Sequence, residues 1–269
     1  MHRHRTPRFF AAVSLGSLTF ALGAQVALAD TTVGGNSTTP VLTSTGGNVT
    51  VASGGTITLV NGSAVTVDSS NTATVASGGT IAMGAGNGAT GITVNPGTTT
   101  TISNAGAINV TENYTAPFIT NNGVNIADGP IAAASNRYGI HVLSGGTVTG
   151  SVTNSGTISV EGLNSAGIAL DSTLNGNLGN TGTISVKGDN SAGIRTSAVT
   201  GNVTAGGTVT AIGQGAQALV TSGDIGGTLK INGTLGQATT YTADDGTSQV
   251  LSRTALQSGA AAVEVDGNV

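Results

Sequence analysis

The sequence predicts an all-β fold, a right-handed parallel β-helix (β-solenoid) with about 24–26 residues per coil. The segment NSGTISV at residues 154–160 returns as NTGTISV at 180–186, and NSAGI at 164–168 returns at 190–194. Both shifts are 26 residues, a period typical of architectures in which each repeat is one coil. The composition agrees, because the chain holds 44 Gly and only 3% aromatic residues.

This composition suits a narrow aliphatic core. Val, Ile and Thr favour extended backbone through their branched Cβ, whereas the chain has no Trp to fill a wide core. The net charge is −4 with 8 Lys plus Arg in total, so a basic patch for nucleic acid is excluded. The absence of Cys is compatible with a chain that stays unfolded while it crosses a membrane.

Residues 1–29 are predicted to be a secretory signal peptide. Three arginines are followed by an apolar run from about Phe9 to Leu22 and then by Ala27-Leu28-Ala29, the order that such peptides show. We expect recognition by the Sec export machinery and cleavage after Ala29. An uncleaved anchor is the alternative, but the run is interrupted by Ser, Gly and Thr and is shorter than the roughly 20 apolar residues that span a bilayer.

Residues 30–40 are expected to be a disordered or capping segment, and residues 41–269 a β-helix domain that is incomplete at its C-terminus. The segment VASGGTI at 51–57 recurs at 75–81, and its alternation bounded by Gly-Gly indicates half-buried strands. ISNAGAINV at 102–110 matches NSGTISV after 50 residues, which we interpret as two coils. IGGTLKI at 225–231 follows AGGTVTA at 205–211 after only 20 residues and indicates a short coil. At roughly 25 residues each, nine or ten coils are expected.

Each clear coil reads as three short strands, for example 156–160, 167–170 and 173–178. Alternation points Ile158 and Val160 inward, and stacking would place Ile184 and Val186 on them one strand spacing away. Asn154 and Asn180 are expected at corners, because Asn tolerates positive φ and its amide can bond the backbone or the same Asn one coil away. AAAVEVDGNV at 260–269 resembles the opening of a further coil.

Two stretches depart from the repeat, Thr111–Arg137 and Gln237–Gln257. In solenoids such insertions map to loops on one face, often the binding face. The possible binding residues are the aromatic and charged side chains that these stretches collect: Tyr114, Phe118, Arg137, Tyr241, Asp244 and Asp245.

The leader, the N-[ST]-G-T-I-S-V and N-S-A-G-I repeats and the lack of Cys resemble the passenger domains of autotransporter (type V secreted) proteins of Gram-negative bacteria. That resemblance implies an exported rod, at the cell surface, in the outer membrane or outside the cell. It also implies a C-terminal β-barrel translocator, for which this chain shows no run of alternating ten-residue strands after residue 200. The sequence is therefore expected to be the front part of a longer protein.

Catalytic chemistry has little support in the sequence. Glycoside hydrolysis needs two facing carboxylates, and the only adjacent pair, Asp244 and Asp245, precedes Gly246 and indicates a turn. His141 has no recognisable Ser or Asp partner. The tandem G-G-x-G-x-D motif of calcium-binding β-rolls is missing. We expect no enzymatic activity, no cofactor and no metal site.

The expected function is therefore structural and adhesive: adhesion or self-association through faces rich in Thr, Ser and Asn, or through the two breaks. The partners would be surface glycans or proteins of a host or of bacteria, or other copies of the chain. A polysaccharide-active β-helix enzyme is the alternative.

Overall fold

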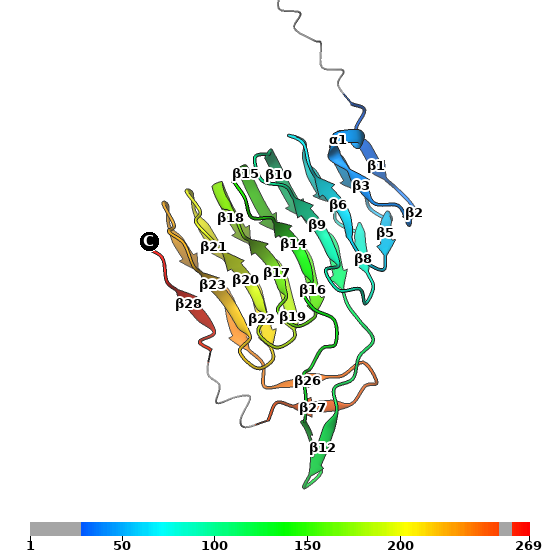
Figure 1. The fold of residues 1–269 in the computed structure, drawn as a ribbon, viewed down its shortest axis with the longest axis vertical. Helices are drawn as coiled ribbons and strands as arrows, with labels where there is room; N and C mark the ends of the chain where they lie inside the picture. The colour runs from blue at the N-terminus through cyan, green and yellow to red at the C-terminus, as the bar shows by residue number, and fades with distance from the viewer. Residues whose placement is uncertain (1–27, 253–259) are drawn as a thin grey trace, which may run out of the picture.

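The computed structural model describes residues 28–252 and 260–269, and in this part of the chain it is a β-solenoid. Successive coils stack side by side from the N-terminal to the C-terminal end of a rod (Figure 1). The fold class predicted from the repeat is confirmed. The predicted leader lies almost wholly outside the described residues.

Three parallel sheets of eight strands form the sides of the rod, because each coil contributes one strand to each side. Sheet A holds, in spatial order, β1 (Thr31–Val33), β4 (Val49–Val51), β7 (Ala73–Val75), β10 (Thr99–Asn104), β15 (Thr147–Asn154), β18 (Thr173–Asn180), β21 (Val203–Ala205) and β24 (Leu229–Ile231). Sheet B holds β2 (Asn36–Ser37), β5 (Thr56–Leu59), β8 (Thr80–Met83), β11 (Ala107–Val110), β16 (Thr157–Glu161), β19 (Thr183–Lys187), β22 (Thr208–Ile212) and β25 (Thr234–Gln237). Sheet C holds β3 (Val41–Leu42), β6 (Ser63–Val67), β9 (Thr90–Val94), β14 (Tyr138–Val142), β17 (Ala166–Leu170), β20 (Ala192–Thr196), β23 (Gln217–Thr221) and β28 (Val263–Val265).

The described chain contains one helical turn, α1 (Thr43–Gly46), and no helix whose length and hydropathy would suffice to cross a bilayer. β28 pairs with β23 in sheet C, so residues 263–265 take the place that NSAGI has in the earlier coils, as expected, but they complete the eighth coil, which β24 and β25 begin, and do not open a further one.

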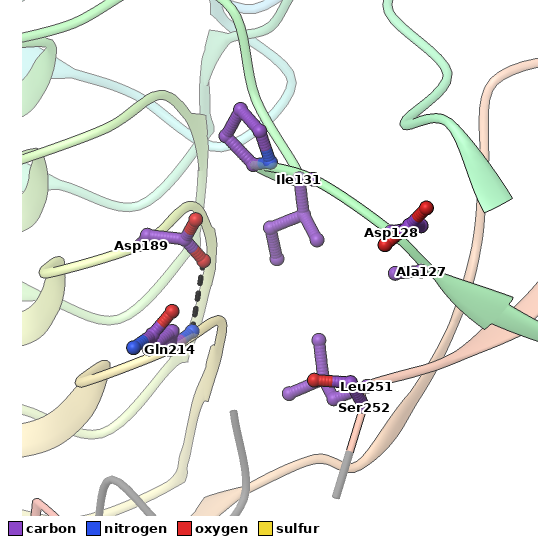
Figure 2. A pocket seen from close by; sticks show the side chains of 9 residues that line it. Ala127, Asp128, Ile131, Asp189, Gln214, Leu251 and Ser252 are labelled. Carbon is purple, nitrogen blue, oxygen red and sulfur yellow. Dashed lines mark hydrogen bonds between the residues drawn. The ribbon is translucent and has the colours of Figure 1, made fainter. Parts of the chain in front are cut away.

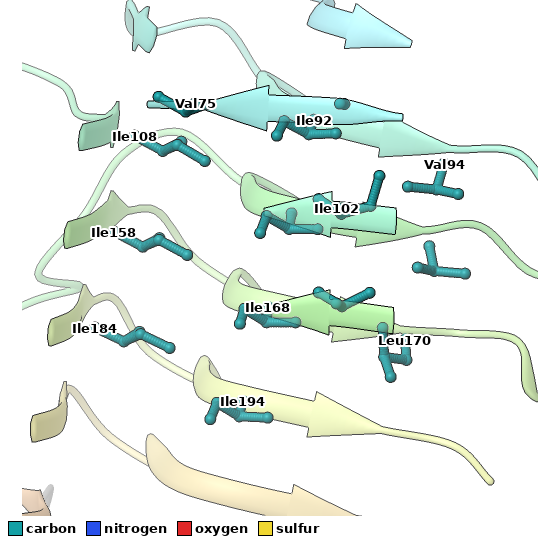
Figure 3. Close-up of a cluster of buried hydrophobic side chains, with 14 of the residues drawn as sticks. Val75, Ile92, Val94, Ile102, Ile108, Ile158, Ile168, Leu170, Ile184 and Ile194 are labelled. Carbon is teal, nitrogen blue, oxygen red and sulfur yellow. The ribbon is translucent and has the colours of Figure 1, made fainter. Parts of the chain in front are cut away.

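The core consists of aliphatic ladders, as the alternation predicts (Figure 3). Ile158 pairs in register with Ile184, and Val160 with Val186; all four side chains are buried. A second ladder in sheet C joins Ile140, Ile168 and Ile194. Because most inward positions hold Val, Ile or Leu, and a few hold Ala or Met, the narrow interior is filled by aliphatic side chains without aromatic rings.

The NSAGI motif has a structural reason at its glycine. A Cβ on Gly167 would lie 2.4 Å from Ile184 Cγ2 and 2.6 Å from the carbonyl oxygen of Gly193, too close for any side chain. Gly167 therefore faces the core beside Ile168, and only glycine fits there. The Asn that opens the motif takes positive φ, 51° at Asn164 and 54° at Asn190. Asn154 and Asn180 do lie at corners, as the last residues of β15 and β18 before the chain turns into sheet B, but they lack the positive φ, which Asn164 and Asn190 have.

Asn154 and Asn180 form a buried amide ladder, which confirms the expected contact between equivalent Asn residues. Asn104 Nδ2 donates to Asn154 Oδ1 at 2.7 Å, and Asn154 Nδ2 donates to Asn180 Oδ1 at 2.7 Å. Asn180 Nδ2 ends the ladder on the carbonyl of Gly206 at 2.6 Å. All three Asn residues are at most 1% exposed, so these hydrogen bonds fix the coil register inside the rod.

The coil boundaries differ from the expectation in two places. Asn104 pairs directly with Asn154, so the 50-residue shift spans one coil that carries an insertion, not two coils. The copy of AGGTVTA at 205–211 is INGTLGQ at 231–237, because β22 pairs with β25; the coil interpreted as short has an ordinary length. For these reasons each side of the rod has eight strands, fewer than the nine or ten coils expected.

The first coil begins at Thr31, ahead of the expected boundary at Val41. β1 and β2 pair with β4 and β5, so residues 31–37 already belong to the solenoid. Polar Asn36 and Ser37 stand where the next coil has Thr56 and Ile57, which hides the repeat in the sequence.

Replacing Asn154 by Ala is expected to destabilise the rod by about 2–3 kcal/mol, because Asn180 Oδ1 then loses its buried donor and Asn104 Nδ2 its best acceptor. Chemical denaturation measures the change. The matched control is Asn175→Ala in the same sheet, where an exposed amide accepts one bond from Thr200 and the expected loss is under about 1 kcal/mol. Equal losses in the two variants would refute a special role for the ladder.

Candidate functional site

The two breaks in the repeat meet in space and form one lobe beside the rod (Figure 1). We define the lobe as residues 111–137 and 238–252. Its sheet D joins, in order, β12 (Phe118–Asn121), β13 (Val124–Ala127), β27 (Ser248–Val250) and β26 (Thr240–Thr242). The two breaks join where β13 runs parallel to β27 at Ile126 and Val250. Residues 253–259, the end of the second break, lie outside the described residues.

The lobe has its own small core. It is formed by the following buried residues: Ala116, Ala127, Ile131, Tyr241, Ala243 and Leu251. Ile212 at the end of β22 packs against this cluster from the rod. Tyr241 Oη donates to Gln249 Oε1 at 2.8 Å, and Gln249 Nε2 donates to the carbonyl of Ala116 at 3.0 Å. Burial raises the pKa of Tyr241 to about 12, with smaller contributions from neighbouring acidic groups such as Asp189 and Asp244.

Arg137 closes the base of the first insertion. Its side chain is fully buried, and its guanidinium donates to the carbonyls of Glu161, Gly84 and Thr111, the last at 2.9 Å. Gly84 and Glu161 belong to the coils before and after the insertion, and Thr111 is its first residue. Burial lowers the pKa of Arg137, whereas the charges of Glu112 and Glu161 oppose that shift. Arg137 therefore ties the rod together across the insertion, and its guanidinium does not face solvent.

A sequence signal for Arg137 exists. Residues 136–140 read NRYGI, which aligns with NSAGI, so Arg137 occupies the position of Ser165 and Ser191. The backbone agrees, since the Arg137 amide donates to Ser165 Oγ and the Ser165 amide to Ser191 Oγ, each at 3.0 Å. Because Arg is longer than Ser, the side chain at this position reaches the carbonyls of Gly84, Thr111 and Glu161.

Lys187 binds the second insertion to the rod. Lys187 Nζ lies 2.8 Å from Glu161 Oε1 and 3.4 Å from Asp244 Oδ1, with a side chain only 9% exposed. It also lies 5.8 Å from the centre of the Tyr241 ring. Glu161 and Lys187 are register partners one coil apart, so the repeat brings this pair together. The contact with Asp244 depends on the lobe.

Asp244 and Asp245 occupy a turn, as the Asp-Gly sequence predicts. Gly246 has a φ of 84°, and its amide donates to the carbonyl of Ala243 at 2.9 Å. Asp244 Oδ2 accepts the amide of Tyr114 at 2.6 Å, which links the two breaks. Asp245 Oδ1 accepts the amide of Thr247, and such hydrogen bonds lower the pKa of Asp245. Both carboxylates thus accept hydrogen bonds from backbone amides of the lobe, and Asp244 also pairs with Lys187 of the rod.

Phe118 lies on the outermost part of the lobe, on the hairpin of β12 and β13. The hairpin turns at Asn122 and Gly123, both with positive φ, the pattern of a two-residue type I′ turn. Its large apolar side chains face solvent: Phe118 is 39% exposed, Ile119 53% and Val124 46%. Of the six residues selected from the sequence, Phe118 is the exposed aromatic one, while Tyr114 is half-buried and packs against the lobe core.

A cavity of about 360 Å³ lies between the lobe and the rod. Asp128 from the lobe and Asp189 from the rod lie on opposite sides of it, and Ile131 and Leu251 also line it (Figure 2). Asp189 Oδ1 accepts the amide of Gln214 at 2.8 Å. Burial raises the pKa of Asp189, although this hydrogen bond opposes the shift. Neither carboxylate is among the six residues selected from the sequence.

His141 lies on the outer face of sheet C, between the inward-facing Ile140 and Val142. Its Nε2 lies 2.8 Å from Asp171 Oδ2, and Asp171 Oδ1 also accepts from Arg195 at 2.8 Å. The hydrogen bond with His141 and the charge of Arg195 lower the pKa of Asp171, against the effect of burial. The His141 ring stacks on Tyr138. In the described residues no three His, Cys, Asp or Glu side chains are placed to hold a metal ion.

Comparison of the chain with protein-family models, with curated proteins and with solved structures gives no match. The fold assignment therefore rests on the strand order and the registers of the three sheets. The resemblance to autotransporter passengers stays a prediction from the sequence.

Replacing Arg137 by Met is expected to cost about 3–5 kcal/mol, because three carbonyls at the base of the insertion lose their donor and two carboxylates lose a neighbouring cation. Chemical denaturation measures the loss. Arg195→Met is the control: Arg195 is about one-third exposed and binds a surface carboxylate, so under about 1 kcal/mol is expected. A small loss in the Arg137 variant would contradict its role at the base of the lobe.

Proposed function

We propose that this protein is an exported, cell-surface or extracellular scaffold whose rod presents the lobe for adhesion or self-association. The observation that carries the proposal is the exposed apolar hairpin of β12 and β13 at the outer end of the lobe. Clustered large apolar side chains on a soluble surface are typical of contact sites. The signal-peptide pattern of residues 1–29 supports export.

The construction of the lobe also supports a contact role. It is held to the rod by Lys187 and across its base by Arg137, so the hairpin stands on a fixed support. Meanwhile the polar and charged groups of the lobe mostly bind one another or backbone amides. What the lobe offers to a partner is therefore mainly apolar side chains and free strand edge.

Cell-surface display tests this proposal. The full chain is fused to a heterologous outer-membrane anchor in bacteria that do not clump, and settling and binding to glycan-coated surfaces are measured. We expect clumping or surface binding, and its loss when Phe118, Ile119 and Val124 are all replaced by Thr. The control is Val60→Thr, because Val60 is 68% exposed but lies on the rod. Displayed wild type that neither clumps nor binds would overturn the proposal.

A polysaccharide-active enzyme is the second candidate, favoured by the cavity between Asp128 and Asp189. A raised pKa on one of two facing carboxylates is the pattern that acid catalysis of glycoside cleavage uses. Assays for released reducing ends on bacterial and host polysaccharides test it. Cleavage that Asp189→Asn abolishes, while Asp171→Asn just after β17 leaves it intact, would establish this candidate in place of the first.

A further inference from the structure

β12 is the outer edge of sheet D, and all four of its residues are exposed. The other edge strand, β26, carries Tyr241, whose ring faces Lys187 of the rod. The hairpin projects away from the stacked coils, with β12 beyond β27 (Figure 1). A second polypeptide can therefore approach β12 without meeting the rod.

The hairpin register decides which backbone groups of β12 are free. Asn121 pairs with Val124 across the two-residue turn, and the amide of Asp128 donates to the carbonyl of Pro117. Hydrogen-bonded pairs alternate with non-bonded pairs in an antiparallel ladder, so residues 117, 119 and 121 bond to β13. The amides and carbonyls of Phe118 and Thr120 consequently point to the open edge.

This edge lacks the usual protection against pairing. Natural edge strands carry charges, inward lysines, bulges or prolines that prevent association. Residues 118–127 contain no charged side chain, and Pro117 precedes the strand without blocking the amides of Phe118 and Thr120. The hairpin therefore has no charge that would attract a charged partner. For the same reason two copies of it can approach each other without electrostatic repulsion.

We propose that β12 pairs antiparallel with β12 of a second copy of this chain about a two-fold axis, which joins the two lobes into one continuous sheet. The contact is self-complementary: the same edge amides and carbonyls and the same apolar side chains, Phe118 and Ile119, meet on both sides. This inference deepens the proposed function, on which it rests, by naming the partner and the strand. The two rods then lie at opposite ends of the joined sheet.

Sedimentation velocity of the purified protein tests the pairing. We expect a concentration-dependent dimer for the wild type. Thr120→Pro removes an edge amide that the hairpin itself does not use and is expected to weaken the dimer about thirtyfold, because a two-fold contact loses two hydrogen bonds. Thr120→Val keeps the amide and is expected to keep the dimer. An unchanged denaturation midpoint in both variants shows that the fold is intact.

A cross-link adds a second measurement that does not depend on the proline. The chain has no Cys, so Ile119→Cys is expected to form an intermolecular disulfide on mild oxidation, whereas the rod variant Val60→Cys stays largely monomeric. A wild type that is monomeric, or equal cross-linking of both variants, would overturn the pairing. If displayed cells still clump or bind in that case, the adhesive function stands and only the self-pairing fails; if they do neither, the function fails as well.

Discussion

The structure depends on one constraint, the register between coils. Each inward side chain must stack on its counterpart roughly 4.8 Å away, the distance between hydrogen-bonded strands. The aliphatic ladders satisfy this constraint because side chains of similar size stack on one another. They tolerate exchange among Val, Ile and Leu, as where Ile184 pairs with Val209. The amide ladder of Asn104, Asn154 and Asn180 is more selective, because a shift of one residue would leave buried polar groups without partners. Together they make one alignment of the coils far more stable than its neighbours.

The same constraint explains why the lobe exists as a separate body. Extra residues cannot enter a coil whose strands must stay in register, so the insertion leaves the rod after β11 and returns at β14. At the base of the insertion the Arg137 guanidinium donates hydrogen bonds to backbone carbonyls. Arg137 occupies the position that a small Ser has in the following coils. Lys187 connects the second insertion to the rod, since its ammonium group pairs both with its register partner Glu161 and with Asp244 in the lobe. The rod thus holds the lobe with two buried cations.

The sequence was sufficient to predict the fold class, the inward residues of the clear coils and the position of both breaks, and for Asn154 and Asn180 it left the equivalent Asn as one of two possible partners. Each of these features appears in the sequence either as a periodic repeat or as a stretch where the repeat is interrupted. That the breaks meet was not predictable, because Gln249 and Ala116 make their contact across 133 residues with no repeat to align them. Arg137 was selected for its charge and lies buried, a placement that the alignment of NRYGI with NSAGI could have indicated. Asp128 and Asp189 face each other only because the lobe folds back on the rod, so no local pattern marks them.

The central claim is that two interruptions distant in sequence form one lobe. A disulfide between Ile126→Cys and Val250→Cys tests it most directly, since these residues are neighbours in the pairing of β13 with β27 and the chain has no other Cys. Mild oxidation and mass spectrometry of the digested monomer are expected to show the intramolecular cross-link in most molecules. Ile126→Cys combined with Val60→Cys on the rod is expected to show none. Failure of the first pair to cross-link, or equal yields from both pairs, would contradict the account.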